Sequence, residues 1–140
     1  MIQIRYNLLE RWAEKYCISV MAWSPLAKGA LTGKYTPDNL PRFQDVRASD
    51  PLFHLSNFNK IWKLVKVLKY LSKKYGRTPA QIALNWLIMS SPQVIPIPGA
   101  KKPEQVIDNV GSVGWRLSFN GWKLLEEASR SIIIDYSVWY

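Results

Sequence analysis

The chain has 140 residues, 48% of them hydrophobic and seven of them Trp, a composition that predicts a folded domain and excludes a disordered segment. Its single cysteine, Cys17, excludes an intramolecular disulfide framework and a multi-cysteine metal site; we expect it to be a small buried residue in a reducing compartment. The formal net charge of +9 favours anionic partners, either a polyanion or a charged cofactor.

The N-terminal part of the sequence has the pattern of a βαβ unit. The apolar run around Ile2 to Ile4 predicts a strand, the residues from about Leu8 to Lys15 predict a short helix, and Ile18 to Trp23 predict a second strand. No leader pattern precedes the first strand, and the apolar stretch Ile132 to Ile134 is far shorter than a membrane-spanning helix requires. We therefore expect a cytoplasmic protein with no membrane partner.

An irregular stretch follows the second strand, from about Ala27 to Ser56. Gly29, Gly33 and several prolines interrupt regular structure there. Loops of this length in compact domains are usually lids or binding loops. Because the stretch follows a strand end directly, it lies where barrel enzymes build their active sites.

A lysine-rich amphipathic helix is predicted next. Its apolar residues recur at i, i+3, i+4 and i+7, which puts its lysines on the opposite face. We interpret this face as a solvated helix surface; a polyanion partner is the alternative, and nucleic acid is disfavoured because no base-stacking aromatic residues accompany the lysines. The apolar positions are Ile61, Leu64, Val65, Leu68, Leu71 and Tyr75, and the lysines are Lys60, Lys63, Lys66, Lys69, Lys73 and Lys74.

The segment Thr78-Pro79-Ala80-Gln81 has the signature of a helix start. Thr78 is expected to be the N-cap, Pro79 the first helical residue and Gln81 the partner of the cap, in a helix that continues to about Met89. Beyond it, Val94 to Ile97 predicts a short strand. Pro96 lacks an amide donor, which assigns this strand to an edge or terminal position.

Two further helices are predicted before the C-terminal tail. Pro103 starts one that runs to about Val110, and Ser118 caps another that runs to about Arg130, with Gly121 weakening its first turn. Strands that alternate with helices predict a parallel α/β fold without internal repeats, in one domain covering residues 1–140.

Two segments have the chemistry of phosphate-binding loops. Trp23 to Tyr35 contains glycines that allow tight backbone turns and two lysines. Ile97 to Asn109 combines a Pro-Gly-Ala turn and two lysines with the free N–H groups of a helix start. Taken alone, each is equally well explained as an ordinary surface loop or strand-to-helix turn.

Together, the two segments resemble the cofactor-binding part of the aldo-keto reductases, NADP(H)-dependent oxidoreductases with a (β/α)₈ barrel. Residues 3–11 are similar to the sixth strand of that family and residues 78–86 to its next-to-last barrel helix. The likeness covers about residues 3 to 128, and the tail from Ile132 to Tyr140 has no counterpart in it. It implies the C-terminal half of such a barrel: α/β, with about three parallel strands and flanking helices.

The resemblance also implies which residues contact NADP(H). Gln3 corresponds to the residue that binds the nicotinamide carboxamide, and Trp23 to the one that stacks on the nicotinamide ring. Lys101 beside Gly99 favours the 2′-phosphate of NADPH over NADH. The other implied contacts are Ser24, Pro25, Leu26, Ala27 and Lys28 at the pyrophosphate, Lys34 and Arg42 in the same loop, Gly99 and Lys101 at the 2′-phosphate and ribose, and Gln105, Asp108 and Asn109 at the adenine.

The family's proton donor, a Tyr assisted by Lys, Asp and His, comes from strands that would precede Gln3 in this comparison. The resemblance therefore implies no catalytic residue, and no metal ligand, in this chain. Tyr6 matches a structural position of the sixth strand, and His54 is interpreted as a solvated loop histidine. Without a proton donor, a nicotinamide site cannot reduce a carbonyl by the ordinary route.

A partial barrel has two open sheet edges and an uncovered inner face, which natural sheets avoid. We therefore expect a partner: a separately encoded N-terminal half of the barrel or a second copy of this chain. A small carbonyl compound would be the substrate only of the completed barrel. The alternatives are a truncated remnant, or a non-enzymatic interaction module that binds protein or polyanion through the sheet edges and the lysine-rich helix.

Overall fold

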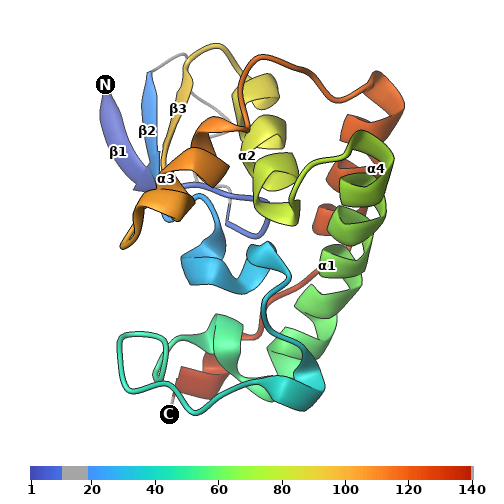
Figure 1. The fold of residues 1–140 in the computed structure, drawn as a ribbon. Helices are drawn as coiled ribbons and strands as arrows, with labels where there is room; N and C mark the ends of the chain where they lie inside the picture. The colour runs from blue at the N-terminus through green and yellow to red at the C-terminus, as the bar shows by residue number, and fades with distance from the viewer. Residues whose placement is uncertain (11–18, 140) are drawn as a thin grey trace.

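The computed structural model describes residues 1–10 and 19–139 (Figure 1). Three parallel strands, β1 (Ile2–Arg5), β2 (Val20–Trp23) and β3 (Val94–Ile97), form one sheet in the order β1-β2-β3. The predicted parallel α/β fold is confirmed. Because β3 pairs with β2 at the end of this order, Pro96 stands in a terminal strand of the described sheet, as its missing N–H requires.

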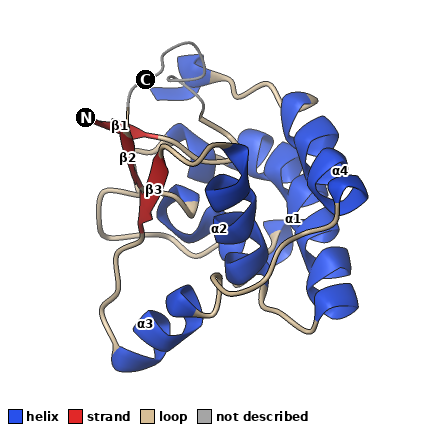
Figure 2. Cartoon of the chain, turned by 90° about the horizontal axis from the view of Figure 1, so that it is seen from above, coloured by secondary structure: helices blue, strands red, loops and turns tan. Residues whose placement is uncertain are grey.

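Four α-helices accompany the sheet in the described part of the chain: α1 (Leu55–Tyr75), α2 (Pro79–Ser90), α3 (Pro103–Val110) and α4 (Phe119–Arg130). α2 lies between the sheet and α1, and α4 packs on α1 (Figure 2). Apolar side chains of α1 and α2, with those of the sheet and the loops, form the core. α3 is set apart from the α1–α4 pair, and none of its side chains is buried.

The helix starts read from the sequence are confirmed. The Thr78 hydroxyl oxygen accepts from the Gln81 N–H at 3.1 Å, and the Gln81 side-chain oxygen accepts from the Thr78 N–H at 3.1 Å. The Ser118 hydroxyl caps α4 by accepting from the Gly121 N–H at 3.2 Å. A Cβ at position 121 would lie 3.1 Å from the Tyr75 hydroxyl, so close packing of α4 on α1 explains the glycine.

The helix predicted from Leu8 to Lys15 is wrong at its start. Leu8–Glu10 belong to a turn, because the side-chain oxygen of Asn7 accepts from the backbone N–H groups of Leu9 and Glu10 at 2.8 and 3.1 Å. The remainder of that helix and Cys17 lie outside the described residues.

The irregular stretch after β2 contains three short 3₁₀ helices, η1 (Ala27–Thr32), η2 (Pro37–Asn39) and η3 (Pro51–Phe53). A fourth, η4 (Tyr136–Trp139), lies in the C-terminal tail. The lysine-rich helix is confirmed as α1: its predicted apolar side chains are buried, apart from the half-buried Tyr75, and its lysines are exposed or half-buried. Within residues 1–10 and 19–139, no helix is long and apolar enough to cross a membrane.

Candidate functional site

A pocket of about 570 Å³ lies where β2 and β3 end, and both predicted phosphate-binding segments line it. The first loop, residues 24–35, follows β2, and the second loop, residues 98–105, follows β3. Because parallel strands carry their carboxyl ends to the same edge of the sheet, the two loops meet there. Residues 45–47 form a third part of the wall.

The first loop has an unusual backbone. Ser24, Ala27 and Lys28 have φ values of 52°, 49° and 52°, in the left-handed region that side chains with a Cβ rarely adopt. Local hydrogen bonds oppose this strain: the Lys28 N–H donates to the Ser24 hydroxyl at 3.2 Å, and the Thr32 hydroxyl donates to the Gly29 carbonyl at 2.7 Å. Such strained turns persist only where their surroundings determine them fully.

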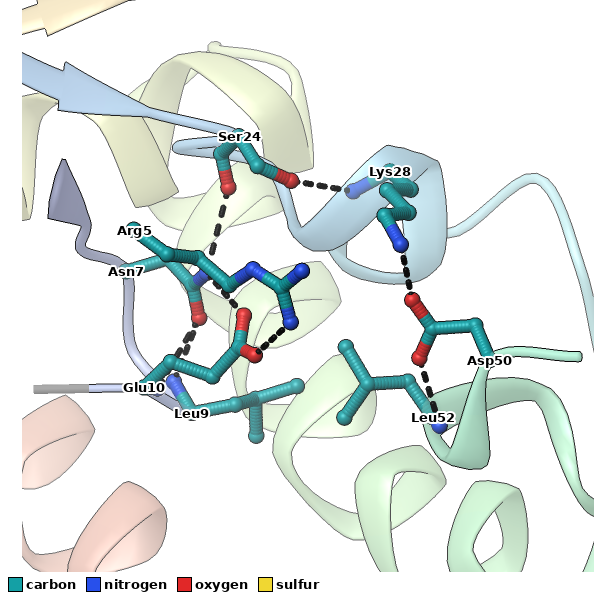
Figure 3. A network of polar contacts seen from close by, with 8 residues as sticks. All are labelled: Arg5, Asn7, Leu9, Glu10, Ser24, Lys28, Asp50 and Leu52. Carbon is teal, nitrogen blue, oxygen red and sulfur yellow. Dashed lines mark hydrogen bonds and ion pairs between the residues drawn. The ribbon is translucent and has the colours of Figure 1, made fainter. Parts of the chain in front are cut away.

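A buried polar network fixes the entry to the first loop (Figure 3). Asn7 is fully buried, and its amide nitrogen donates to the Ser24 carbonyl at 3.1 Å and to the Glu10 carboxylate at 2.9 Å. Glu10 also accepts from the Arg5 guanidinium at 2.7 Å. The guanidinium lies 4.7 Å from the centre of the Trp23 ring. The end of β1 therefore holds the end of β2 in place.

Lys28 is held at the pocket wall by a buried carboxylate. Its ammonium forms an ion pair with Asp50, whose side chain is only 3% exposed. Asp50 in turn accepts from the Leu52 N–H at 2.9 Å at the start of η3. An ammonium carries three donors, so the contact with Asp50 leaves donors for a phosphate in the pocket.

The second loop is organised by one side chain. The Gln105 oxygen accepts from the backbone N–H groups of Lys101 and Lys102 at 2.7 and 3.2 Å. Residues 99–107 are all exposed, and Lys101 and Gln105 line the pocket whereas Lys102 does not. A Cβ at Gly99 would meet no atom within 4 Å, so this glycine borders open space that a ligand can approach closely.

Sequence reasoning missed a cluster of three side chains in the pocket wall. Arg47 donates to the Asp45 carboxylate through two nitrogens, at 2.9 and 2.6 Å, and to the Tyr35 hydroxyl at 2.8 Å. These hydrogen bonds lower the pKa of Asp45 well below its ordinary value. An Asp two residues from an Arg in a loop is too common a pattern to have indicated this cluster. Arg42, the arginine chosen from the sequence, is exposed and is not among the lining residues.

Five other predicted residues also lie outside the pocket wall. Gln3 on β1 and Trp23 on β2 occupy rows of the sheet that share one face, and Trp23 directly precedes the pocket-lining Ser24. The Asp108 carboxylate accepts from the Thr78 hydroxyl at 2.8 Å, which ties α3 to the start of α2. Asn109 is half-buried near the end of α3. The other residues predicted to bind cofactor line the pocket, except Ala27, which is fully buried beneath the first loop.

The residues around the pocket fit a phosphorylated dinucleotide. Lys28, Lys34, Lys101 and Arg47 bring four cationic groups from three segments, against the single carboxylate of Asp45 in the lining. The α3 N-terminus adds backbone N–H groups beside them. No group of three or more His, Cys, Asp or Glu side chains that could hold a metal occurs among the described residues. This is the chemistry of an anion site at the carboxyl edge of a parallel sheet.

The sequence model of the aldo/keto reductase family matches residues 1–130. The chain belongs to this family. It is 33% identical over 112 residues to the aldo-keto reductase yakc [NADP(+)] of Schizosaccharomyces pombe, covering 79% of this chain and 33% of that protein. It is 31% identical over 139 residues to the NADH-specific methylglyoxal reductase of Escherichia coli, covering 94% of this chain and 42% of that protein.

A solved structure has the same fold. The glycerol dehydrogenase of Gluconobacter oxydans matches with a TM-score of 0.80 and 30% identity, over 96% of this chain and 44% of that one. The three strands and flanking helices described here are thus part of a (β/α)₈ barrel architecture. The chain spans between 32% and 42% of the length of these curated relatives.

Proposed function

We propose that this chain is the NADP(H)-binding part of an aldo-keto reductase. The observation that carries the proposal is the meeting of two loops, from the ends of β2 and β3, at one pocket lined by cationic side chains. Lys28, Lys34, Lys101 and Arg47 would hold the phosphates, and Trp23 would flank the nicotinamide. The nicotinamide itself supplies the hydride that reduces a carbonyl.

We assign NADPH as the preferred cofactor within this proposal. Lys101 is exposed at the second loop, where it can meet a 2′-phosphate without breaking an ion pair in the described structure. Among the relatives, one is named for NADP(+) and another is named as NADH-specific, so membership of the family does not decide between the two cofactors. A cytoplasmic location belongs to the same proposal, because reduced nicotinamide cofactors are intracellular metabolites.

The proton donor for carbonyl reduction is proposed to come from outside this chain. Tyr6 is 6% exposed and packs in the core, and His54 is an exposed loop residue whose ring nitrogen pairs with the Ser56 hydroxyl at 2.8 Å. Neither is placed at the pocket. Reduction of a small carbonyl substrate therefore needs the first part of the barrel, and we expect this chain to be inactive alone.

The surface of the fold favours such a completed barrel. β1 and β3 each have one side that pairs with no other described strand, and Ile95 in β3 is 47% exposed. On α3, Val106, Ile107 and Val110 are 51%, 74% and 61% exposed. Apolar side chains at an unpaired sheet edge are those that a neighbouring βα unit would cover. We propose a polypeptide carrying the N-terminal barrel strands as the partner, with self-association as the competing outcome.

Titration with NADPH, followed by tryptophan fluorescence, tests the proposed function. We expect NADPH to quench the fluorescence, NADH to bind about tenfold more weakly, and tripolyphosphate to compete without quenching Trp23. Lys101→Ala should weaken NADPH binding, and Lys102→Ala is its matched control because Lys102 lies outside the pocket wall. Equal losses in both variants, or no saturable NADPH binding, would contradict the proposal.

A further inference from the structure

The C-terminal tail, residues 132–138, lies beyond the residues that the family model matches and packs onto the start of α1. Asn57, fully buried near the start of α1, donates to the Asp135 carbonyl at 2.8 Å and accepts from the Asp135 N–H at 2.9 Å. The Lys60 ammonium donates to the Ile133 carbonyl at 3.1 Å. Ile134 is 8% exposed and belongs to the core. The tail is thus an integral part of the described fold.

The same Asn57 side chain connects the tail to the segment that holds Lys28. Its amide nitrogen also donates to the Pro51 carbonyl at 3.0 Å, and Pro51 follows Asp50 directly. Val138 and the Asp50–Pro51 pair line one cavity of about 480 Å³. Burial of part of its ring and the charge of the Glu10 carboxylate raise the pKa of Tyr136.

These contacts form a continuous path from the tail to the pocket. Asp135 contacts Asn57, Asn57 contacts Pro51, and the adjacent Asp50 holds the ammonium of Lys28. Asn57, Pro51 and Asp50 are buried on this path, whereas Asp135 at its outer end is exposed and Lys28, which lines the pocket wall, is half-buried. A buried, fully hydrogen-bonded amide has few alternative arrangements, so a displacement at one end is transmitted to the other.

We propose that the tail is a positioning element for cofactor binding: by holding Asn57 and the Asp50–Pro51 segment, it fixes the Lys28 ammonium at the pocket. The tail acts on Lys28 through the Asp50–Pro51 segment. The inference rests on the proposed function, because the pocket is taken to bind NADPH.

A double-mutant cycle tests the proposal. Shortening the chain after Ser131 and substituting Lys28→Met should each weaken NADPH binding by about tenfold, and the two changes together should weaken it little more than either alone. Lys34→Met is the matched control: Lys34 lines the same pocket, but in the described part of the chain Asp50 pairs with Lys28 and forms no ion pair with Lys34. The fold loss of NADPH affinity caused by Lys34→Met should multiply with the fold loss caused by shortening the tail. Multiplicative effects with Lys28→Met, or an unchanged affinity after shortening, would overturn the proposal.

Hydrogen exchange without nucleotide separates this inference from the proposed function. Shortening the tail should speed exchange of the amides of residues 28–31 at least fivefold and leave those of residues 101–105 unchanged. If the shortened chain does not fold, Ile134→Ala serves instead, because it loosens the tail while keeping Asn57 and its Pro51 contact. Unchanged exchange at residues 28–31 overturns the inference even if NADPH binds; changed exchange without NADPH binding overturns only the proposed function.

Discussion

The two loops that form the pocket are built in opposite ways. The first loop is strained at Ser24 and Lys28, and buried contacts from Asn7 and Asp50 hold it. The second loop is exposed throughout residues 99–102 and is organised by the side chain of Gln105 alone among the hydrogen bonds described. The first loop is therefore set before a ligand arrives, and the second is free to adapt to it. The free-energy cost of ordering the site on ligand binding therefore falls mainly on the second loop.

The largest expected effect comes from removing the support of the first loop. Asn7→Ala would leave the N–H groups of Leu9 and Glu10 and the Ser24 carbonyl without their buried partner. We expect it to lower the free energy of unfolding by about 2–3 kcal/mol, the usual cost of unsatisfied buried polar groups. Urea denaturation would measure this. A loss below about 0.5 kcal/mol would show that the first loop does not depend on Asn7.

A smaller effect is expected from Asp50→Asn, which keeps an acceptor for the Leu52 N–H but removes the charge that faces Lys28. We expect about 1–2 kcal/mol of lost stability, less than for a fully buried pair because Lys28 is partly exposed. Thermal unfolding would measure the loss. The double variant Asp50→Asn with Lys28→Met should recover part of it; no recovery would mean that the charge pair is not the cause.

The second loop should respond in the opposite sense. Gln105→Ala removes the acceptor for Lys101 and Lys102 at an exposed site, so stability should change by no more than about 0.5 kcal/mol. NADPH binding should nevertheless weaken by about threefold to tenfold, because the ligand must then order the loop itself. Calorimetric titration would measure the affinity. A large stability loss with unchanged affinity would reverse the comparison.

The smallest expected effect concerns pH at the third part of the wall. Arg47 lowers the pKa of Asp45 below its ordinary value. The ion pair between Asp45 and Arg47 is therefore fully formed when the pH is at or above the ordinary pKa of an aspartate, and it is lost only as the pH falls through the lowered pKa. Carboxyl chemical shifts from NMR should show Asp45 titrating below the ordinary range. In Arg47→Ala the titration should return to that range; an unchanged titration would assign the shift to another group.

Local sequence signals predicted most of the fold. The cap at Thr78, Pro103 at a helix start and the period of α1 are local patterns, and each was found in the structure. The helix predicted from Leu8 was wrong at Leu8–Glu10 for a local reason as well. The side-chain oxygen of Asn7 accepts hydrogen bonds from the N–H groups of Leu9 and Glu10, which stabilises a turn in place of the helix.

The pocket was predictable only in part. Glycine and lysine spacing indicated the two loops, whereas the roles of Asn7, Asp50 and Arg47 depend on partners 12 to 22 residues away in sequence. No period or motif encodes such pairings in a single sequence. Asp50 before Pro51 did carry the signal of a cap, which the side chain fulfils at η3, but its ion pair with Lys28 is purely tertiary.

Hydrogen exchange of the 140-residue chain with and without NADPH tests the central claim most directly. If the two loops bind one dinucleotide between them, both should gain protection. The gain should be larger in residues 99–105, which are loosely held, than in residues 24–34, which are already ordered, and α4 should not change. Protection of neither loop, or protection confined to the lysine face of α1, would contradict the account.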